Sequence, residues 1–109
     1  PFVWLLGVPW QEAGTAGGLM GIKLVLNELI AYLHMAGLAP GTLDPRSSEI
    51  MVYAMCGFAN FASIGILIAG MSALMPERRQ DVVALAPRAL LAGTLASSLS
   101  GAMIGLLPL

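Results

Sequence analysis

The sequence predicts an all-α membrane protein, and three observations support this fold class. Hydrophobic residues make up 58% of the 109 residues and charged residues only 10%, whereas soluble domains carry about 25% charged residues. Residues 50–76 and 89–109 contain no charged side chain and are long enough to cross a bilayer as helices. Residues 14–43 are also apolar, but Asn27 and Glu28 interrupt them near the middle. We therefore expect a re-entrant helical hairpin, a discontinuous transmembrane helix and a C-terminal transmembrane helix.

The composition also excludes several classes of function. The net charge is −1, so the chain offers no basic surface for nucleic acid. One cysteine, Cys56, cannot form an internal disulfide or a CxxC metal pair, and one histidine, His34, cannot form a His-rich metal site. The first residue is Pro1, without an initiator Met or a signal-peptide pattern. We expect a piece of a longer domain, with no metal and no cofactor of its own.

Residues 1–13 are expected to form the end of a membrane helix and a surface loop, because Pro9 marks a break. In residues 14–43, each half around Asn27–Glu28 is shorter than the roughly 20 residues that a spanning helix needs. Two short helices with a turn at Asn27–Glu28 are therefore predicted. The alternative is one continuous, tilted span.

Residues 46–76 are expected to form a broken transmembrane helix, beginning at a cap provided by Ser47 or Ser48. Asn60 lies near the centre of this uncharged segment, and Ser63 follows three residues later, on the same helical face. Gly57 lowers the cost of unwinding. We predict a break between Gly57 and Ser63; the alternative is an unbroken span in which Asn60 makes an interhelical hydrogen bond.

Residues 77–88 are expected to form a charged cytoplasmic loop, and residues 89–109 the last transmembrane helix. Of the five basic residues, Arg78, Arg79 and Arg88 lie in this loop, which places it inside by the positive-inside rule. Residues 50–76 cross the membrane once, so the hairpin would enter from the outer side and return to it.

Glu28 is the main candidate for a functional residue. A carboxylate near the centre of a bilayer costs about 2.5–3.5 kcal/mol on insertion scales, so it is expected to face a cavity or a solute. Alternatively, Glu28 lies near the membrane surface or pairs with Lys23. Hydrocarbon cannot satisfy polar side chains, and we therefore expect Glu28, Asn60 and Ser63 to converge on one cavity.

Two motifs carry a resemblance to a known family. Residues 21–32, GIKLVLNELIAY, resemble the GxKxxxNEFVAY signature of concentrative nucleoside transporters, and residues 56–64, CGFANFASI, resemble the second signature, CGFANxxSI. The GVPW motif at 7–10 and the PERR motif at 76–79 also fit. The sequence departs from the first signature at Leu29–Ile30, where Phe-Val is usual, which is a change among apolar residues.

The resemblance implies a role for each candidate residue. In that family, the residues that match Glu28, Asn60 and Ser63 hydrogen-bond the ribose hydroxyls. The residue that matches Phe58 lies beside the nucleoside. Supporting positions are Lys23, Asn27 and Gly57. A carboxylate accepts charge-assisted hydrogen bonds from hydroxyls, and amide and hydroxyl groups both donate and accept.

The resemblance further implies sodium- or proton-coupled nucleoside uptake across a cell membrane, such as the bacterial inner membrane. It implies a homotrimer, and it places most of the ion site and the base-reading residues in the missing part of the chain. Three alternatives remain. An intramembrane enzyme using Glu28 as a base would need a nucleophile or metal ligands, which the sequence does not offer; a structural subunit and a channel segment would lack concentrative uptake.

Overall fold

The computed structural model describes residues 1–108, and these residues form helices and no strand. The all-α prediction is confirmed. In chain order the elements are α1 (Phe2–Leu5), α2 (Ala13–Val25), α3 (Glu28–Ala36), α4 (Pro45–Met55), α5 (Phe61–Leu74), the 3₁₀ helix η1 (Pro76–Arg78) and α6 (Arg79–Ile104).

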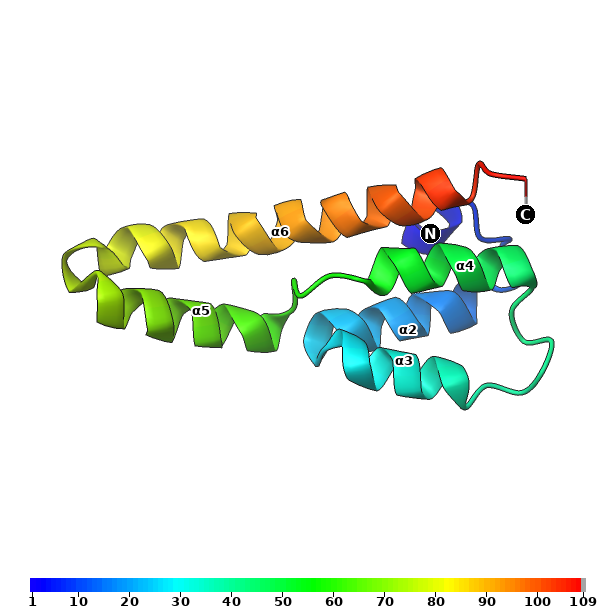
Figure 1. Ribbon diagram of the computed structural model, residues 1–109, viewed down its shortest axis with the longest axis horizontal. Helices are drawn as coiled ribbons and strands as arrows, with labels where there is room; N and C mark the ends of the chain where they lie inside the picture. The colour runs from blue at the N-terminus through cyan, green and yellow to red at the C-terminus, as the bar shows by residue number, and fades with distance from the viewer. Residues whose placement is uncertain (109) are drawn as a thin grey trace.

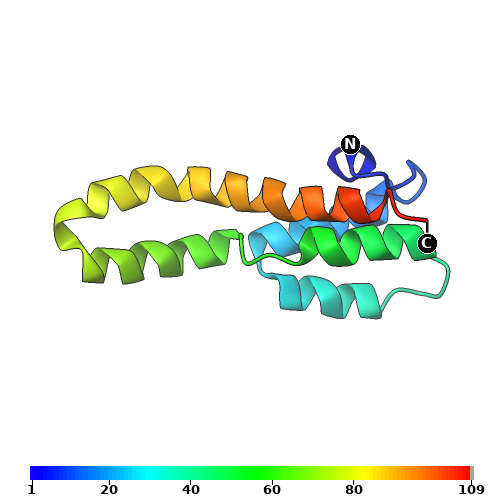
Figure 2. The ribbon, with the colours of Figure 1, turned by 45° about the horizontal axis from the view of Figure 1, so that its top comes forward.

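The molecule is elongated, with extents of 51 × 26 × 20 Å. Helix α6 runs along nearly all of the long axis, and α4 and α5 lie end to end beside it in the opposite direction (Figures 1 and 2). Helices α2 and α3 flank α4, and α2 also reaches the start of α5. At 1.5 Å per residue, α6 is about 39 Å long, which exceeds the roughly 30 Å of a bilayer's hydrocarbon core.

The segment predicted as a hairpin is divided into two helices. Helix α2 ends at Val25 and α3 begins at Glu28, and the two run antiparallel in contact with each other (Figure 1). Asn27 begins α3 as its N-cap, with its side-chain oxygen accepting a hydrogen bond of 3.0 Å from the Ile30 amide. One continuous span is therefore not what the chain forms here; that the hairpin re-enters a membrane stays a prediction.

The segment predicted as a broken helix consists of α4 and α5, separated by non-helical residues 56–60. The prediction that Ser47 or Ser48 caps α4 is wrong. Asp44 is the cap, and its carboxylate accepts a hydrogen bond of 2.5 Å from the Ser47 amide. Pro45 explains the difference, because a proline pushes the preceding residue into the extended conformation that an N-cap requires.

The charged segment 77–88 was predicted to be a loop, and this is wrong. After η1, residue Arg79 begins α6, so most of the segment is helical and the last helix is Arg79–Ile104 instead of 89–109. Charge indicates contact with water and does not determine backbone conformation, and Pro87 lies inside the helix without ending it. Counted with η1 as Pro76–Ile104, this is the one helix in the described part of the chain long and apolar enough to cross a membrane. The predicted helix end at Leu109 lies outside the described residues.

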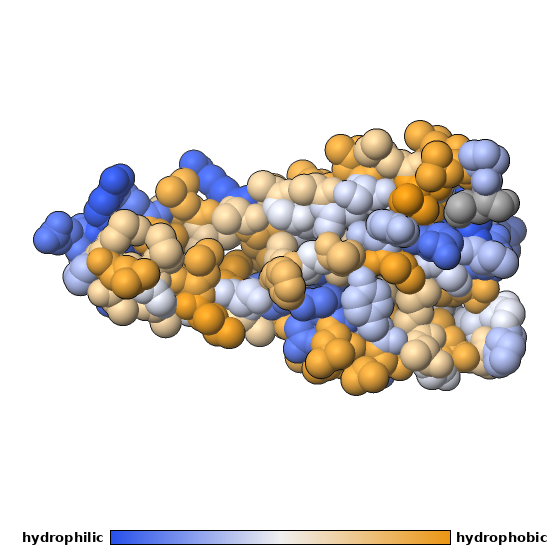
Figure 3. Space-filling view, viewed as in Figure 1, coloured by the Kyte–Doolittle hydropathy of each residue, from blue (hydrophilic) through white to orange (hydrophobic). Residues whose placement is uncertain are grey.

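The buried core is formed by side chains of α1 and the loop after it, α2, α3 and α4, and α6 packs against α4 beside it. Gly101 of α6 is required there, because a Cβ atom at this position would lie 2.6 Å from the Ile50 carbonyl oxygen of α4. On the face seen in Figure 3, apolar side chains cover much of the surface, and hydrophilic residues lie at both ends of the molecule and near its middle. This distribution is expected of a protein whose sides contact lipid or further protein.

Candidate functional site at the two helix interruptions

Two interruptions of the helices lie close together, about halfway along the molecule. The tip of the α2–α3 hairpin, at residues 26–27, approaches the gap between α4 and α5, at residues 56–60 (Figures 1 and 2). Helix α2 accordingly contacts both α4 and α5. The structure thus brings the two sequence motifs together, although 23 residues separate them (33 to 55).

An asparagine begins the helix that follows each interruption. The Asn60 side-chain oxygen accepts a hydrogen bond of 2.7 Å from the Ser63 amide, as Asn27 does from Ile30. In addition, the Asn60 amide nitrogen donates to the Phe58 carbonyl at 3.2 Å. Asn60 is only 2% exposed. Because an N-cap satisfies backbone amides that have no partner in the helix, these bonds fix where α3 and α5 begin.

A cavity of about 340 Å³ lies beside the second interruption, within the size range of ligand pockets. Its walls include Phe58, Asn60 and Ser63, so three of the four residues predicted to bind substrate line one space. The remaining walls are apolar and come from the interruption, α5 and α6: Ala59, Ile64, Ile66, Leu67, Ala86, Ala89 and Leu90. The Phe58 ring is 81% exposed and therefore free to contact a ligand.

Glu28, the fourth predicted residue, is the first residue of α3 and does not line this cavity. One of its carboxylate oxygens, Oε2, is buried without a hydrogen-bond partner. It also forms no ion pair with Lys23, because the described residues contain a single ion pair, Arg78–Asp81. The convergence of Glu28 with Asn60 and Ser63 on one solute stays a prediction, and the unpartnered oxygen is available to accept a hydrogen bond.

Lys23 and Tyr32 join the hairpin to the broken helix. Lys23 is fully buried, and its Nζ donates a hydrogen bond of 2.9 Å to the Ala59 carbonyl. The Tyr32 hydroxyl donates to the Val52 carbonyl at 2.7 Å. The sequence predicted only a supporting position for Lys23 and no role for Tyr32. Both side chains donate to backbone carbonyls, which every residue has, so the sequence does not show these partners.

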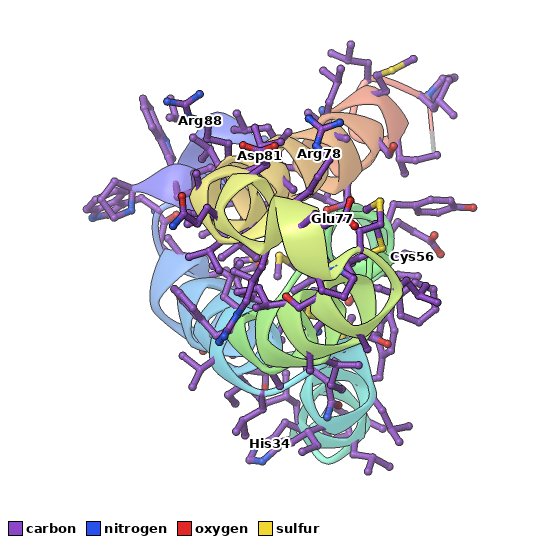
Figure 4. The ribbon with its side chains drawn as sticks, turned by 90° about the vertical axis from the view of Figure 1, so that its left-hand side faces the viewer. His34, Cys56, Glu77, Arg78, Asp81 and Arg88 are labelled. Carbon is purple, nitrogen blue, oxygen red and sulfur yellow. The ribbon has the colours of Figure 1, made fainter. Side chains whose placement is uncertain are left out.

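The remaining polar residues do not form a second site of this kind. Figure 4 shows His34 on the opposite side of the molecule from Arg78, Asp81 and Arg88, which belong to η1 and the first turns of α6. Within residues 1–108 no three His, Cys, Asp or Glu side chains could together hold a metal ion. The interruptions are therefore the best candidate site.

Broken helices with polar groups halfway along their length are typical of membrane transporters. The chain belongs to the family of Na⁺-dependent nucleoside transporters, because the model of the C-terminal part of that family matches residues 1–105. The resemblance noted in the two motifs is thereby confirmed.

Individual relatives agree with this assignment. The chain is 46% identical to the uncharacterized transporter YutK of Bacillus subtilis, over 97% of this chain and 26% of the relative. It is 42% identical to the putative nucleoside permease NupX of Escherichia coli, over 96% and 26% of the two chains. Solute carrier family 28 member 3 of Mus musculus is 38% identical over 98% of this chain and 17% of its own.

Solved structures show the same fold. CNTnw in an inward-facing substrate-bound state superimposes with a TM-score of 0.87 and 41% identity, over 94% of this chain and 26% of CNTnw. A CNTnw variant in an intermediate state gives a TM-score of 0.91 and 42% identity, over 97% and 27% of the two chains. The chain therefore spans about a quarter of the length of the bacterial relatives that it matches.

Proposed function

We propose that this chain is the C-terminal part of a secondary active, cation-coupled nucleoside transporter and supplies the ribose-binding half of its site. The observation that supports this most directly is the meeting of two helix interruptions beside a cavity that carries Phe58, Asn60 and Ser63. If α6 crosses the membrane, its midpoint lies near the bilayer midplane, which is where transporters of this kind bind their substrates.

The capping bonds leave Asn60 able to bind a sugar. Its side-chain oxygen has two lone pairs and its nitrogen two hydrogens, and the protein uses one of each. Asn60 can therefore still accept one hydrogen bond and donate another. The Ser63 hydroxyl adds a donor and an acceptor, and the exposed Phe58 ring offers an apolar surface to the sugar or base.

Glu28 completes this half of the site. Its unpartnered Oε2 would accept a hydrogen bond from a ribose hydroxyl, and bonds to a charged acceptor are the stronger kind. A solute without those hydroxyls would leave buried polar groups unpaired, at a cost of about 1–3 kcal/mol for each group. Selection for ribonucleosides follows from this cost.

The other parts of the proposal concern the whole transporter. Sodium or a proton is the coupling ion, and its site lies mostly in the rest of the chain, as do the residues that read the base. The protein is a multi-pass transporter of the bacterial inner membrane and assembles as a homotrimer. The hairpin is re-entrant from the outer side, and residues 76–81 face the cytoplasm. No reaction step and no cofactor are involved.

The test compares two substrates in the full-length protein. Glu28→Gln keeps the shape of the side chain but replaces a charged acceptor with a neutral amide. We expect uptake of labelled uridine to fall at least about tenfold, the equivalent of about 1.4 kcal/mol. Uptake of 2′,3′-dideoxyuridine should fall much less, because its sugar lacks the hydroxyls concerned.

Surface expression of the variant is the control, and sodium and pH are varied separately to identify the coupling ion. Equal losses for both substrates would assign Glu28 to coupling or folding and refute its role in sugar recognition. Uptake that never exceeds the outside concentration would indicate a channel, and unaltered uridine uptake would indicate a carboxylate without contact to the solute.

A further inference from the structure

The interruption between α4 and α5 leaves backbone carbonyls without helical partners. The last carbonyls of any helix lack an intrahelical donor, and residues 56–60 after α4 are not helical. Buried backbone groups must nevertheless be paired, because an unpaired one costs about as much as a lost hydrogen bond. The donors to this segment therefore show what holds it in place.

The segment supplies some of these donors itself. The Cys56 amide donates to the Tyr53 carbonyl, the Gly57 amide to the Met55 carbonyl, and the Asn60 side chain to the Phe58 carbonyl. These bonds are all local, spanning three residues or fewer. They shape the turn but do not position it relative to the rest of the molecule.

The hairpin supplies the donors to two further carbonyls. Lys23 on α2 donates to Ala59, within the interruption, and Tyr32 on α3 donates to Val52, in the last turn of α4. One donor lies on each arm of the hairpin, and both lie within five residues of its tip at 26–27. The interruption is thus held at two points by the element that carries Glu28.

Helix α6 packs closely against the interruption at Gly57. A Cβ atom at Gly57 would lie 3.1 Å from the Ser97 Cβ and 3.9 Å from the Lys23 Nζ. The Lys23 side chain and α6 therefore both approach the backbone at Gly57. The contact with α6 and the two hydrogen bonds from the hairpin together hold residues 52–60 in place.

We propose that Lys23 and Tyr32 are positioning residues that fasten the hairpin tip to the α4–α5 interruption, so that Glu28, Asn60 and Ser63 keep a fixed spacing. The proposal rests on the proposed function, because the spacing matters for a solute that bridges the hairpin and α5. Neither residue needs to touch the solute. Their loss should weaken recognition of the ribose hydroxyls specifically, since only these require both elements at once.

The first experiment does not depend on transport. Hydrogen–deuterium exchange is measured on the full-length protein carrying Tyr32→Phe or Lys23→Met. Losing one fastening hydrogen bond should speed exchange in peptides covering residues 52–60 by about fivefold, with no change in peptides covering residues 95–104. Tyr53→Phe is the matched control. Tyr53 is exposed and lies on α4 next to Val52, so its substitution should leave exchange unchanged.

The second experiment measures the KM values for uridine and 2′,3′-dideoxyuridine. Tyr32→Phe should raise the KM for uridine by about fivefold, leaving Vmax and the KM for the dideoxy substrate within about twofold. Lys23→Arg, which keeps a donor, should recover part of the loss caused by Lys23→Met.

The two experiments separate failure of this proposal from failure of the proposed function. Unchanged exchange at residues 52–60 in both variants would overturn the fastening, as would equal KM increases for the two substrates. A wild-type protein that takes up no nucleoside would refute the proposed function, and the exchange result would then decide the fastening alone.

Discussion

Helices α4 and α5 lie in line along the same side of α6, yet they are packed very differently. Helix α4 buries Ser47, Ile50, Met51, Ala54 and Met55, whereas α5 buries no residue. The hairpin covers the other side of α4, and no described helix other than α6 and η1 lies along most of α5 (Figure 1).

The difference shows which part of this chain is a packed unit. Around α4 the chain supplies its own core. Along α5 it leaves apolar side chains uncovered, such as Ile66 at 75% exposure and Leu74 at 80%. Since the chain spans about a quarter of its relatives' length, and since lipid also accepts apolar surface, the α5 half depends on surroundings that the α4 half does not need.

The largest expected effect is that of Gly101→Ala at the α4–α6 contact. The added Cβ would lie 2.6 Å from the Ile50 carbonyl oxygen and 2.9 Å from the Ala54 amide nitrogen. These are backbone atoms of a helix and cannot move alone, so α4 and α6 must separate. Overpacking of this kind costs about 1–3 kcal/mol, measured as the free energy of unfolding of the full-length protein in mixed micelles.

Gly70→Ala in α5 is the matched change in the other half. No atom of the described chain lies within 4 Å of a Cβ atom at Gly70. Replacing a mid-helix glycine by alanine should then stabilise the helix by about 0.5–1 kcal/mol. Equal destabilisation by the two changes would contradict the comparison and would mean that the rest of the protein packs as closely on α5 as α6 does on α4.

The sequence predicts the two interruptions because their signals are local. A polar pair between two apolar runs that are each too short to span a bilayer predicts the division at Asn27–Glu28, and a central asparagine beside Gly57 predicts the break before α5. These residues change the local backbone preference directly. The close approach at Gly101 has no such local signal, since its partner Ile50 lies 51 residues away.

The wrong or missing predictions share a different cause. The charged residues around Arg79 indicate contact with water, and both a loop and the first turn of a helix can provide it. The cap of α4 was assigned to Ser47 or Ser48, although Pro45 disfavours helical backbone at Asp44 and an N-cap requires such a non-helical residue. The hydrogen bonds of Lys23 and Tyr32 end on carbonyls, which every residue has, so sequence could not identify them.

The next largest effect is expected at the caps of the two interruptions. Asn60→Ala removes the acceptor for the Ser63 amide and the donor to the Phe58 carbonyl, at a residue that is only 2% exposed. Loss of a cap costs about 0.5–2 kcal/mol, and we expect the upper end because α5 has no buried residue to hold its first turn.

Asn27→Ala is the control for that change. It removes only the bond to the Ile30 amide, from a half-buried residue, in a helix that also packs on α2. Its cost should lie nearer the lower end of the same range. The same mixed-micelle titration measures both variants, and a larger loss for Asn27→Ala would show that the hairpin, and not α5, depends more on its cap.

The smallest effect is expected from the ion pair at the turn between α5 and α6. The Arg78 Nε donates to the Asp81 carboxylate at 3.0 Å, but the two side chains are 71% and 57% exposed. Water and salt screen such a pair, and exposed pairs contribute about 0–1 kcal/mol. Asp81→Asn should therefore change the free energy of unfolding by less than about 0.5 kcal/mol, and still less in high salt.

Asp44→Ala, at the start of α4, is the matched change. The Asp44 carboxylate caps that helix, so its loss should cost about 1 kcal/mol, largely independent of salt. If Asp81→Asn instead cost more than about 1 kcal/mol and the loss depended on salt, the exposed end of the α5 half would be held by charge.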